Sequence, residues 1–332
     1  MRRNRQLLVK KLLLLFVTLI ITILFAEFFL RITYPLYANY NTEMGRYAKE
    51  IKIIRNEQYF EHLSNKTGRY YGVEIRTNST GWREHRDYSL EKPHGVKRII
   101  VLGDSITLGW GVGLNQAYPK VIEQLLNNDP TLKFRYEVIN TGVGNYNTFL
   151  ELEMLKRTLC YDPDMIILGW FINDVEVWGK GNTLVSLLGT YSYLYGFLWD
   201  KLFSIGSRLG LNENYETYYQ KLYTSNHEGI SQFEKSFDSI VHLAKERNIP
   251  LLFLNIPDLH NIKSYPFDLA NDYIKDVVTK RNAHYLNLLD SVKGTKPEIL
   301  WVSFEDPHPN AMANSIFGNR IYHFLKREGL VD

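Results

Sequence analysis

The fold is decided by residues 98–105, which read RIIVLGDS. Residues 98–102 form a nearly continuous apolar run, which is typical of a strand buried on both faces of a parallel sheet. Glycine, aspartate and serine follow this run directly. Because ligands bind outside the carboxyl ends of the strands in open α/β sheets, we expect Ser105 to lie in a crevice.

The rest of the chain repeats this pattern. Further apolar runs, predicted as strands, lie at 136–140, 165–170, 250–256 and 284–288. Helical stretches are predicted at 117–126, 148–159, 230–247, 269–281 and 311–328. Short apolar strands that alternate with helices predict an α/β domain whose parallel sheet is covered on both faces.

Composition excludes several classes of protein. The 332 residues are 45% hydrophobic and 23% charged, which excludes disordered, collagen-like and low-complexity chains. The formal charge of +3 is too even for the strongly basic footprint of a nucleic-acid-binding protein. With a single cysteine, Cys160, the chain cannot form an intramolecular disulfide or a multi-thiolate metal site.

The N-terminus carries the pattern of a membrane-spanning helix. The apolar segment runs from Leu12 to Ala26 and, past Glu27, to Leu30. As a helix, these 19 residues span about 28 Å, close to the hydrocarbon thickness of about 30 Å. The positive-inside rule places the N-terminus in the cytoplasm and the rest of the chain outside, because five basic residues precede the segment: Arg2, Arg3, Arg5, Lys10 and Lys11.

Two other interpretations of this segment stay open. A cleaved signal peptide normally has small residues before the cleavage site, whereas Leu24 stands two places before Ala26. The third interpretation is a packed helix of a soluble protein. We expect an uncleaved single-pass anchor, so that the lipid bilayer is a partner of the chain.

The sequence predicts three regions. Residues 1–33 form the cytoplasmic tip and transmembrane anchor, 34–97 a stalk and irregular lead-in without sustained periodicity, and 98–332 the α/β domain. A helical insertion is expected at about 175–227. Its broad apolar face either packs against the protein, lines an acyl or glycan pocket, or lies on the bilayer. This face consists of Leu187, Leu188, Tyr191, Leu194, Tyr195, Leu198, Trp199, Leu202 and Phe203.

A strand-end serine becomes a nucleophile only beside a base that a third group orients. By itself, Ser105 is more typical of a helix N-cap. Residues 305–310 read EDPHPN just before the last predicted helix, at the same edge of the sheet. There Asp306 can hold one imidazole nitrogen of His308 while the other faces Ser105. The alternative role for His308 is a cap of the last helix.

Four blocks occur in order along the α/β region: Gly103-Asp104-Ser105, Asn140-Thr141-Gly142-Val143-Gly144, Asn173-Asp174 and Asp306-Pro307-His308-Pro309-Asn310. Together with residues 78–83, which read NSTGWR, they resemble the membrane-anchored bacterial members of the SGNH (GDSL-type) hydrolase family. The resemblance implies a three-layer flavodoxin-like parallel sheet with ester or acyl-transfer chemistry. It implies Ser105 as nucleophile, His308 as base and Asp306 as the carboxylate that orients it.

The resemblance also implies an oxyanion hole formed by the backbone N–H groups of Ser105 and Gly144 and the side-chain amide of Asn173. Three positions depart from the family pattern. The commonest spacing puts the acid at Glu305, which stays an alternative to Asp306. The usual glycine of the second block falls on Asn145, which stays an alternative donor to Gly144. Phe171 stands where the third block normally has glycine.

Other chemistries lack their motifs. Gly109, Gly111 and Gly113 alternate at every second position, which does not match a dinucleotide or phosphate loop. The nine histidines include no H-E-x-x-H motif, so we expect neither a metal nor a cofactor. Tryptophans near the strand ends form either a sugar-stacking wall or, more commonly, buried packing: Trp82, Trp110, Trp170 and Trp178.

These observations predict a serine-dependent esterase or O-acyltransferase on the extracytoplasmic side of the membrane. Its expected partner is an acylated glycan or other ester substrate of the envelope or surface, carrying small acyl groups, and not a nucleic acid. Hydrolysis and transfer pass through the same acyl-enzyme, so both remain open. The alternative is a catalytically inactive SGNH-like binding or scaffold protein.

Overall fold

The structure, a computed structural model, describes residues 2–34, 40–56, 59–177, 191–211, 213–224 and 227–332. The chain divides into two compact units. The helical unit comprises Met1–Lys49 and Gly181–Asn212, and the sheet unit comprises Glu50–Lys180 and Glu213–Asp332. Part of the expected insertion lies outside the described residues, including Trp178, Leu187 and Leu188.

The sheet unit contains a five-stranded parallel sheet with the strand order β6-β5-β7-β8-β9. Its strands are β5 (Val96–Gly103), β6 (Arg135–Asn140), β7 (Met165–Trp170), β8 (Leu251–Asn255) and β9 (His284–Asn287). Its long helices are α4 (Tyr118–Asn128), α5 (Thr148–Thr158), α8 (Tyr215–Thr224), α9 (Glu228–Glu246), α10 (Asp268–Lys280) and α11 (Ala311–Arg327). The predicted α/β fold, its five strands and the five helices that alternate with them are confirmed.

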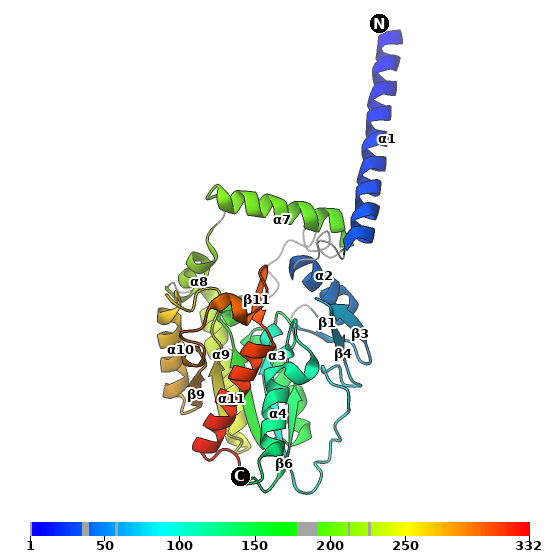
Figure 1. Ribbon diagram of the computed structural model, residues 1–332. Coiled ribbons are helices and arrows are strands. Elements are labelled where there is room, and N and C mark those ends of the chain that lie inside the picture. The colour runs from blue at the N-terminus through cyan, green and yellow to red at the C-terminus, as the bar shows by residue number, and fades with distance from the viewer. Residues whose placement is uncertain (1, 35–39, 57–58, 178–190, 212, 225–226) are drawn as a thin grey trace. The chain divides into compact units, whose positions relative to one another are not determined.

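Both faces of the sheet are buried, which explains why the strands are continuously apolar. In β5, Ile100 and Leu102 join the core on one face, whereas Ile99 and Val101 join the core on the other. Helices α4 and α11 pack side by side over the second face, and α5 and α9 pair over the first (Figure 1). The result is a three-layer arrangement.

The lead-in before the sheet differs from the expected irregular segment. It contains α2 (Tyr40–Glu50) and two antiparallel hairpins, formed by β1 (Lys52–Asn56) with β2 (Tyr59–His62) and β3 (Thr67–Tyr70) with β4 (Val73–Arg76). Strands of four or five residues are too short to establish a period in the sequence. Their buried aromatic residues, among them Phe60 and Tyr70, fix them by tertiary packing.

Short elements complete the sheet unit. The hairpin of β10 (Trp301–Ser303) and β11 (Asp306–Pro309) precedes α11, and the four-residue helix α3 (Ser105–Leu108) follows β5. The 3-10 turns are η2 (Leu114–Gln116), η3 (Leu159–Tyr161), η4 (Ile172–Val175), η5 (Leu289–Ser291) and η6 (Pro297–Leu300). Asn310 caps α11 by accepting a hydrogen bond from Ala313 N at 3.1 Å, so His308 does not serve as that cap.

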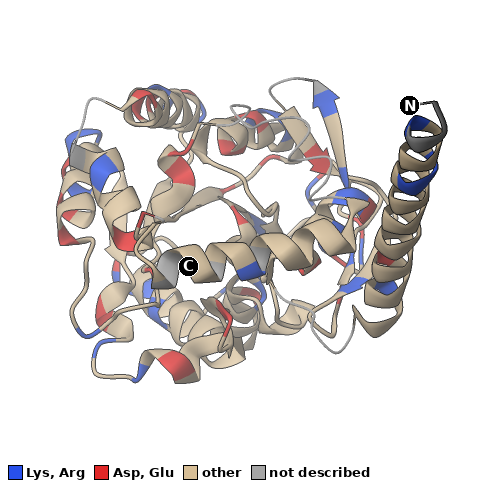
Figure 2. Cartoon of the chain, turned by 90° about the horizontal axis from the view of Figure 1, so that it is seen from above, with Lys and Arg blue, Asp and Glu red and all other residues tan. Residues whose placement is uncertain are grey.

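The helical unit contains α1 (Arg2–Thr33) and α7 (Tyr193–Arg208). Residues Arg5–Thr33 form a helix with a mean hydropathy of 2.7, long and apolar enough to cross a membrane or to act as a signal sequence. Figure 2 shows an uncharged stretch in α1 between Lys11 and Glu27. Apolar side chains along this stretch are exposed, as expected for a helix that has no protein around it.

Candidate active site

Ser105 lies at the carboxyl end of the central strand β5. Asp104 caps α3, because its Oδ1 accepts a hydrogen bond from Ile106 N at 2.8 Å. Ser105 is therefore the first residue of α3, and its backbone N–H has no partner within the helix. The N-cap that the sequence allowed for Ser105 is Asp104 instead. The Ser105 side chain is left to face other groups.

The hairpin of β10 and β11 brings His308 to Ser105. The distance between Ser105 Oγ and His308 Nε2 is 2.9 Å. On the other side of the ring, His308 Nδ1 lies 2.6 Å from Asp306 Oδ1. The backbone N–H of His308 also donates to Asp306 Oδ1, at 3.1 Å. Three side chains from both ends of the domain thus form one continuous hydrogen-bonded chain.

Asp306 is fully buried, and Trp110 is its second partner. The indole Nε1–H of Trp110 donates to Asp306 Oδ2 at 2.9 Å. Burial alone would raise the pKa of Asp306, but the hydrogen bonds from His308 and Trp110 outweigh it and hold the pKa below its ordinary value. Asp306 is therefore ionised at neutral pH. Glu305 is exposed, and the carboxylate that meets His308 Nδ1 is that of Asp306.

The second sequence block forms a turn beside α3. Asn140 donates to Thr107 O at 2.7 Å, and Gly142 packs so closely that a Cβ there would lie 2.4 Å from Leu108 N. Asn145 has a φ of 67° in the turn closed by Tyr146 N and Val143 O. Asparagine tolerates this left-handed conformation, which explains why it can stand where the family pattern has glycine.

Lys52, on β1, holds this turn from outside. Its Nζ donates to Gly144 O and, at 2.9 Å, to Asn145 Oδ1. Both candidate donors of the second block, Gly144 and Asn145, therefore belong to a turn fixed by the lead-in. The sequence carried no signal for Lys52, because β1 lies 92 residues before Gly144.

Asn173 lies in η4, after β7. Its side chain interacts with the carboxylate of Asp104, which in turn lies 3.4 Å from Ser105 Oγ. Asn173 Oδ1 is buried and has no hydrogen-bond partner within the part of the chain that the structure describes. The amide of Asn173 is thus held within reach of the space above Ser105, beside the N-terminus of α3.

Two buried carboxyl groups, Glu151 and Asp174, lie behind these residues. Burial raises the pKa of both well above its ordinary value, and repulsion from neighbouring carboxylates raises it further. Thr148 Oγ1 donates to Asp174 Oδ2 at 3.0 Å. The sequence did carry a signal for Glu151, which interrupts the buried face of α5 formed by Thr148, Leu155 and Thr158.

Arg83 connects the lead-in to the segment after Ser105. The buried guanidinium donates to the carbonyl oxygens of Leu108 at 2.9 Å, Gly109 at 2.6 Å and Val112 at 2.6 Å. These carbonyls lie at and beyond the end of α3, where a helix lacks its own donors. The arginine of the NSTGWR stretch therefore stabilises the segment that presents Ser105.

The tryptophans do not form a sugar-stacking wall. Trp82, Trp110 and Trp170 are all buried, as is common for aromatic residues beside a sheet. The partly exposed tryptophan near the site is instead Trp301, on the hairpin that carries His308. Within the described ranges, no group of three or more His, Cys, Asp or Glu residues could hold a metal ion.

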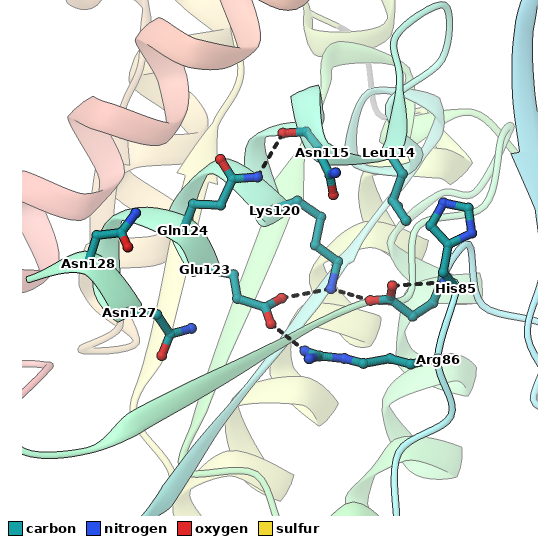
Figure 3. Close-up of a pocket in the computed structure, with 10 residues that line it drawn as sticks. His85, Arg86, Leu114, Asn115, Lys120, Glu123, Gln124, Asn127 and Asn128 are labelled. Atoms are coloured by element: carbon teal, nitrogen blue, oxygen red, sulfur yellow. Dashed lines mark hydrogen bonds and ion pairs between the residues drawn. The ribbon is translucent and has the colours of Figure 1, made fainter.

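A shallow cavity of about 430 Å³ lies elsewhere, beside α4 (Figure 3). Its charged side chains point toward one another: Lys120 pairs with Glu84 and Glu123, and Glu123 pairs with Arg86. These groups largely neutralise each other, which leaves little net charge for a ligand. Neither Ser105 nor His308 lines this cavity.

Residues 101–315 match the GDSL-like Lipase/Acylhydrolase family. The chain belongs to this family. Its blocks at Ser105 and His308 both fall within the matched residues, and the SGNH hydrolase fold agrees with the parallel sheet described above. This GDSL-family protein is accordingly an ester hydrolase by family.

Solved structures similar to this GDSL-family protein are named as esterases. The crystal structure of TesA is 14% identical, with a TM-score of 0.46, and the match covers 70% of this chain and 99% of that one. The acetyl xylan esterase AlAXEase is 18% identical, with a TM-score of 0.46, covering 69% and 99%. The psychrotrophic esterase EstA from Pseudoalteromonas is 14% identical, with a TM-score of 0.45, covering 70% and 98%. No curated protein matches the chain.

Proposed function

We propose that this protein is a membrane-anchored serine esterase or O-acyltransferase that acts on small acyl groups of envelope or surface glycans. One observation carries the proposal: Ser105 Oγ lies 2.9 Å from His308 Nε2, and His308 Nδ1 lies 2.6 Å from the buried Asp306. A hydroxyl, an imidazole and an ionised carboxylate in this order are the requirements for nucleophilic serine chemistry.

In this mechanism Ser105 Oγ attacks the acyl carbonyl while His308 Nε2 accepts the hydroxyl proton. The imidazolium that forms is stabilised by Asp306, which keeps the proton on Nδ1. The carbonyl oxygen becomes an oxyanion, and its donors are the N–H groups of Ser105 and Gly144 with the Asn173 amide, Asn145 being the alternative in the second block. His308 then protonates the leaving alcohol, and the acyl group stays on Ser105 Oγ.

Water or a sugar hydroxyl resolves the acyl-enzyme. His308, neutral again, removes a proton from that hydroxyl, and the acyl group leaves Ser105 as a free acid or as a new ester. The tethered location favours a substrate of the membrane or wall over a freely diffusing metabolite. The basic residues before Leu12 favour a cytoplasmic N-terminus, which puts the sheet unit outside.

An aromatic platform supports a glycan as the ester's carrier. Trp301 and Phe304 lie with their ring centres 6.4 Å apart, and the side chain of Phe304 is 88% exposed. His260, held by Asp258 at 2.9 Å, lies with its ring 6.3 Å from Trp301. Trp301 pairs across the hairpin with Pro309, the neighbour of His308. Exposed rings so close to the reacting groups suit a sugar face.

Labelling with a fluorophosphonate tests the nucleophile. We expect the full-length protein in detergent to be labelled, and the label to disappear in Ser105→Ala. Ser105→Ala and His308→Ala should each lower kcat on the order of 10⁶-fold, and the double variant should lose little more, because the two groups act as a unit. A folded wild-type protein that takes up no label would instead favour the catalytically inactive scaffold.

The glycan carrier has its own test. Phe304→Ala should raise KM for an acetylated oligosaccharide but leave the hydrolysis of p-nitrophenyl acetate unchanged, because only the former has a sugar to stack. Ile299→Ala is the matched control, since Ile299 is also an exposed apolar residue close to the hairpin. Equal effects of both variants on the two substrates would contradict the platform.

A further inference from the structure

Helix α7 of the helical unit exposes a row of large apolar side chains. Leu198, Trp199, Leu202, Phe203 and Ile205 are each about half exposed or more. This result excludes core packing as the role of the described part of the apolar face found in the sequence. We propose that the apolar face of α7 lies in the interface of the lipid bilayer, as a second membrane contact beside α1.

The attachment of α7 to α1 is the first observation. Glu27 of α1 accepts hydrogen bonds from the N-terminus of α7: from Tyr193 N at 3.1 Å, Leu194 N at 2.9 Å and Ser192 Oγ at 2.9 Å. The negative charge suits the positive end of the helix dipole. Arg31 completes the joint, because it bonds Glu27 at 2.8 Å and Tyr191 O at 2.7 Å.

This joint lies at the boundary of the apolar segment of α1. The segment is uncharged from Leu12 to Ala26, and Glu27 is the residue at which charge returns. Carboxylates are tolerated near the end of a spanning helix because they reach the headgroup region. An α1 that spans the bilayer therefore holds the start of α7 at the level of the headgroups.

The pattern of α7 is that of an interfacial helix. Leu198, Leu202, Ile205 and Leu209 follow one another at four, three and four residues, so they form one stripe along the helix. Trp199 and Phe203 widen the stripe on one side. The intervening sequence is polar, with charges at Asp200, Lys201 and Arg208.

The aromatic content favours lipid over a protein partner. Tyr195 and Trp199 stack with their ring centres 5.9 Å apart, and Tyr193 lies 4.9 Å from the Arg31 guanidinium. Tyrosine and tryptophan concentrate at the headgroup level of membrane proteins. A helix with its polar side outward buries its apolar face about 5–10 Å deep at this boundary. Figure 1 shows α7 running across the axis of α1, as this arrangement requires.

The proposal rests on the membrane anchoring of α1, so the experiment includes a probe for each. Three exposed residues are labelled one at a time with the environment-sensitive dye NBD: Leu202→Cys on α7, Ile21→Cys on α1 and Leu269→Cys on α10, each in a Cys160→Ser background. Leu269 is the matched control, because it is a leucine on a helix with a similar exposure, 72% against 65% for Leu202. The full chain is reconstituted in phosphatidylcholine vesicles with or without doxyl-labelled phosphatidylcholine.

We expect the dye at position 202 to lose emission most with a doxyl group near the headgroup, and the dye at 21 most with a doxyl group deep in the chain. The dye at 269 should keep its emission. Quenching at 21 but not at 202 overturns the α7 contact and leaves the anchor intact. No quenching at 21 overturns both. Equal quenching at 202 and 269 indicates general adsorption and also overturns the proposal. Fluorophosphonate labelling of Ser105 is read separately, so failure of the chemistry is distinguishable.

Discussion

Asp306→Asn tests the roles of Asp306 and Trp110 together, because the buried carboxylate accepts only from donors. Oδ1 accepts from the Nδ1–H and backbone N–H of His308, and Oδ2 accepts from the indole of Trp110 at 2.9 Å. An amide has one acceptor arm and one donor arm. It therefore cannot satisfy His308 and Trp110 at the same time.

Each orientation of the new amide has a cost. With its oxygen toward His308, its NH₂ faces the Trp110 N–H, donor against donor. With its oxygen toward Trp110, its NH₂ faces Nδ1 of His308, which must then give up its proton. Nε2 would carry the proton instead and could no longer accept one from Ser105. We expect the second orientation to prevail, and kcat to fall by about 10⁴-fold, as when a triad histidine is held in the wrong tautomer.

Trp110→Phe should partly rescue this variant. Without the indole N–H, the amide can direct its oxygen to His308 at no cost in unpaired donors. A buried unpaired donor costs about 1–3 kcal/mol, so its removal should restore roughly 5- to 150-fold in kcat. In the Asp306 background the same Trp110→Phe change should be harmful, since it removes a hydrogen bond to a buried charge worth about 1.5–3 kcal/mol of stability.

The assay is hydrolysis of p-nitrophenyl acetate by the four proteins of this cycle in detergent, with thermal unfolding to check that each is folded. The sign of the Trp110→Phe effect on kcat is the decisive quantity. If the folded double variant is no more active than Asp306→Asn alone, the assignment of Trp110 as the residue that selects the amide orientation is refuted.

Three further predictions follow from the same site. Asn173→Ala should lower kcat for p-nitrophenyl acetate by about 10²- to 10³-fold with little change in KM, because it removes a donor to the oxyanion; a change confined to KM would contradict this role. Arg83→Met should cost at least about 3 kcal/mol in urea unfolding, since it leaves buried carbonyls without donors, whereas the exposed contact of Arg69 makes Arg69→Met a near-neutral control. The raised pKa of Glu151 means that its stabilising protonated form is lost as pH rises from the ordinary value through the raised one. Glu151→Gln should therefore lose less thermal stability at alkaline pH than wild type, and parallel losses would disprove the protonated carboxyl.

The elements could be predicted from the sequence, because burial on both faces of a parallel sheet leaves a local record. Residues 165–170 were predicted as a strand and form β7 with the same limits. The helix predicted at 148–159 is α5, one residue shorter. The lead-in was not predictable in this way, since its strands contain only four or five residues and depend on packing.

The sequence by itself determined the α/β class, the apolar N-terminal helix and the order of the blocks that contain Ser105 and His308. These features depend on periodicity and on neighbours in the chain. Only the tertiary structure decided that Asp306 rather than Glu305 meets His308, and that Trp110, 196 residues earlier, holds its other oxygen. A hydrogen bond between distant residues is set by the geometry of the assembled sheet, which leaves no periodic trace in the residues that make it.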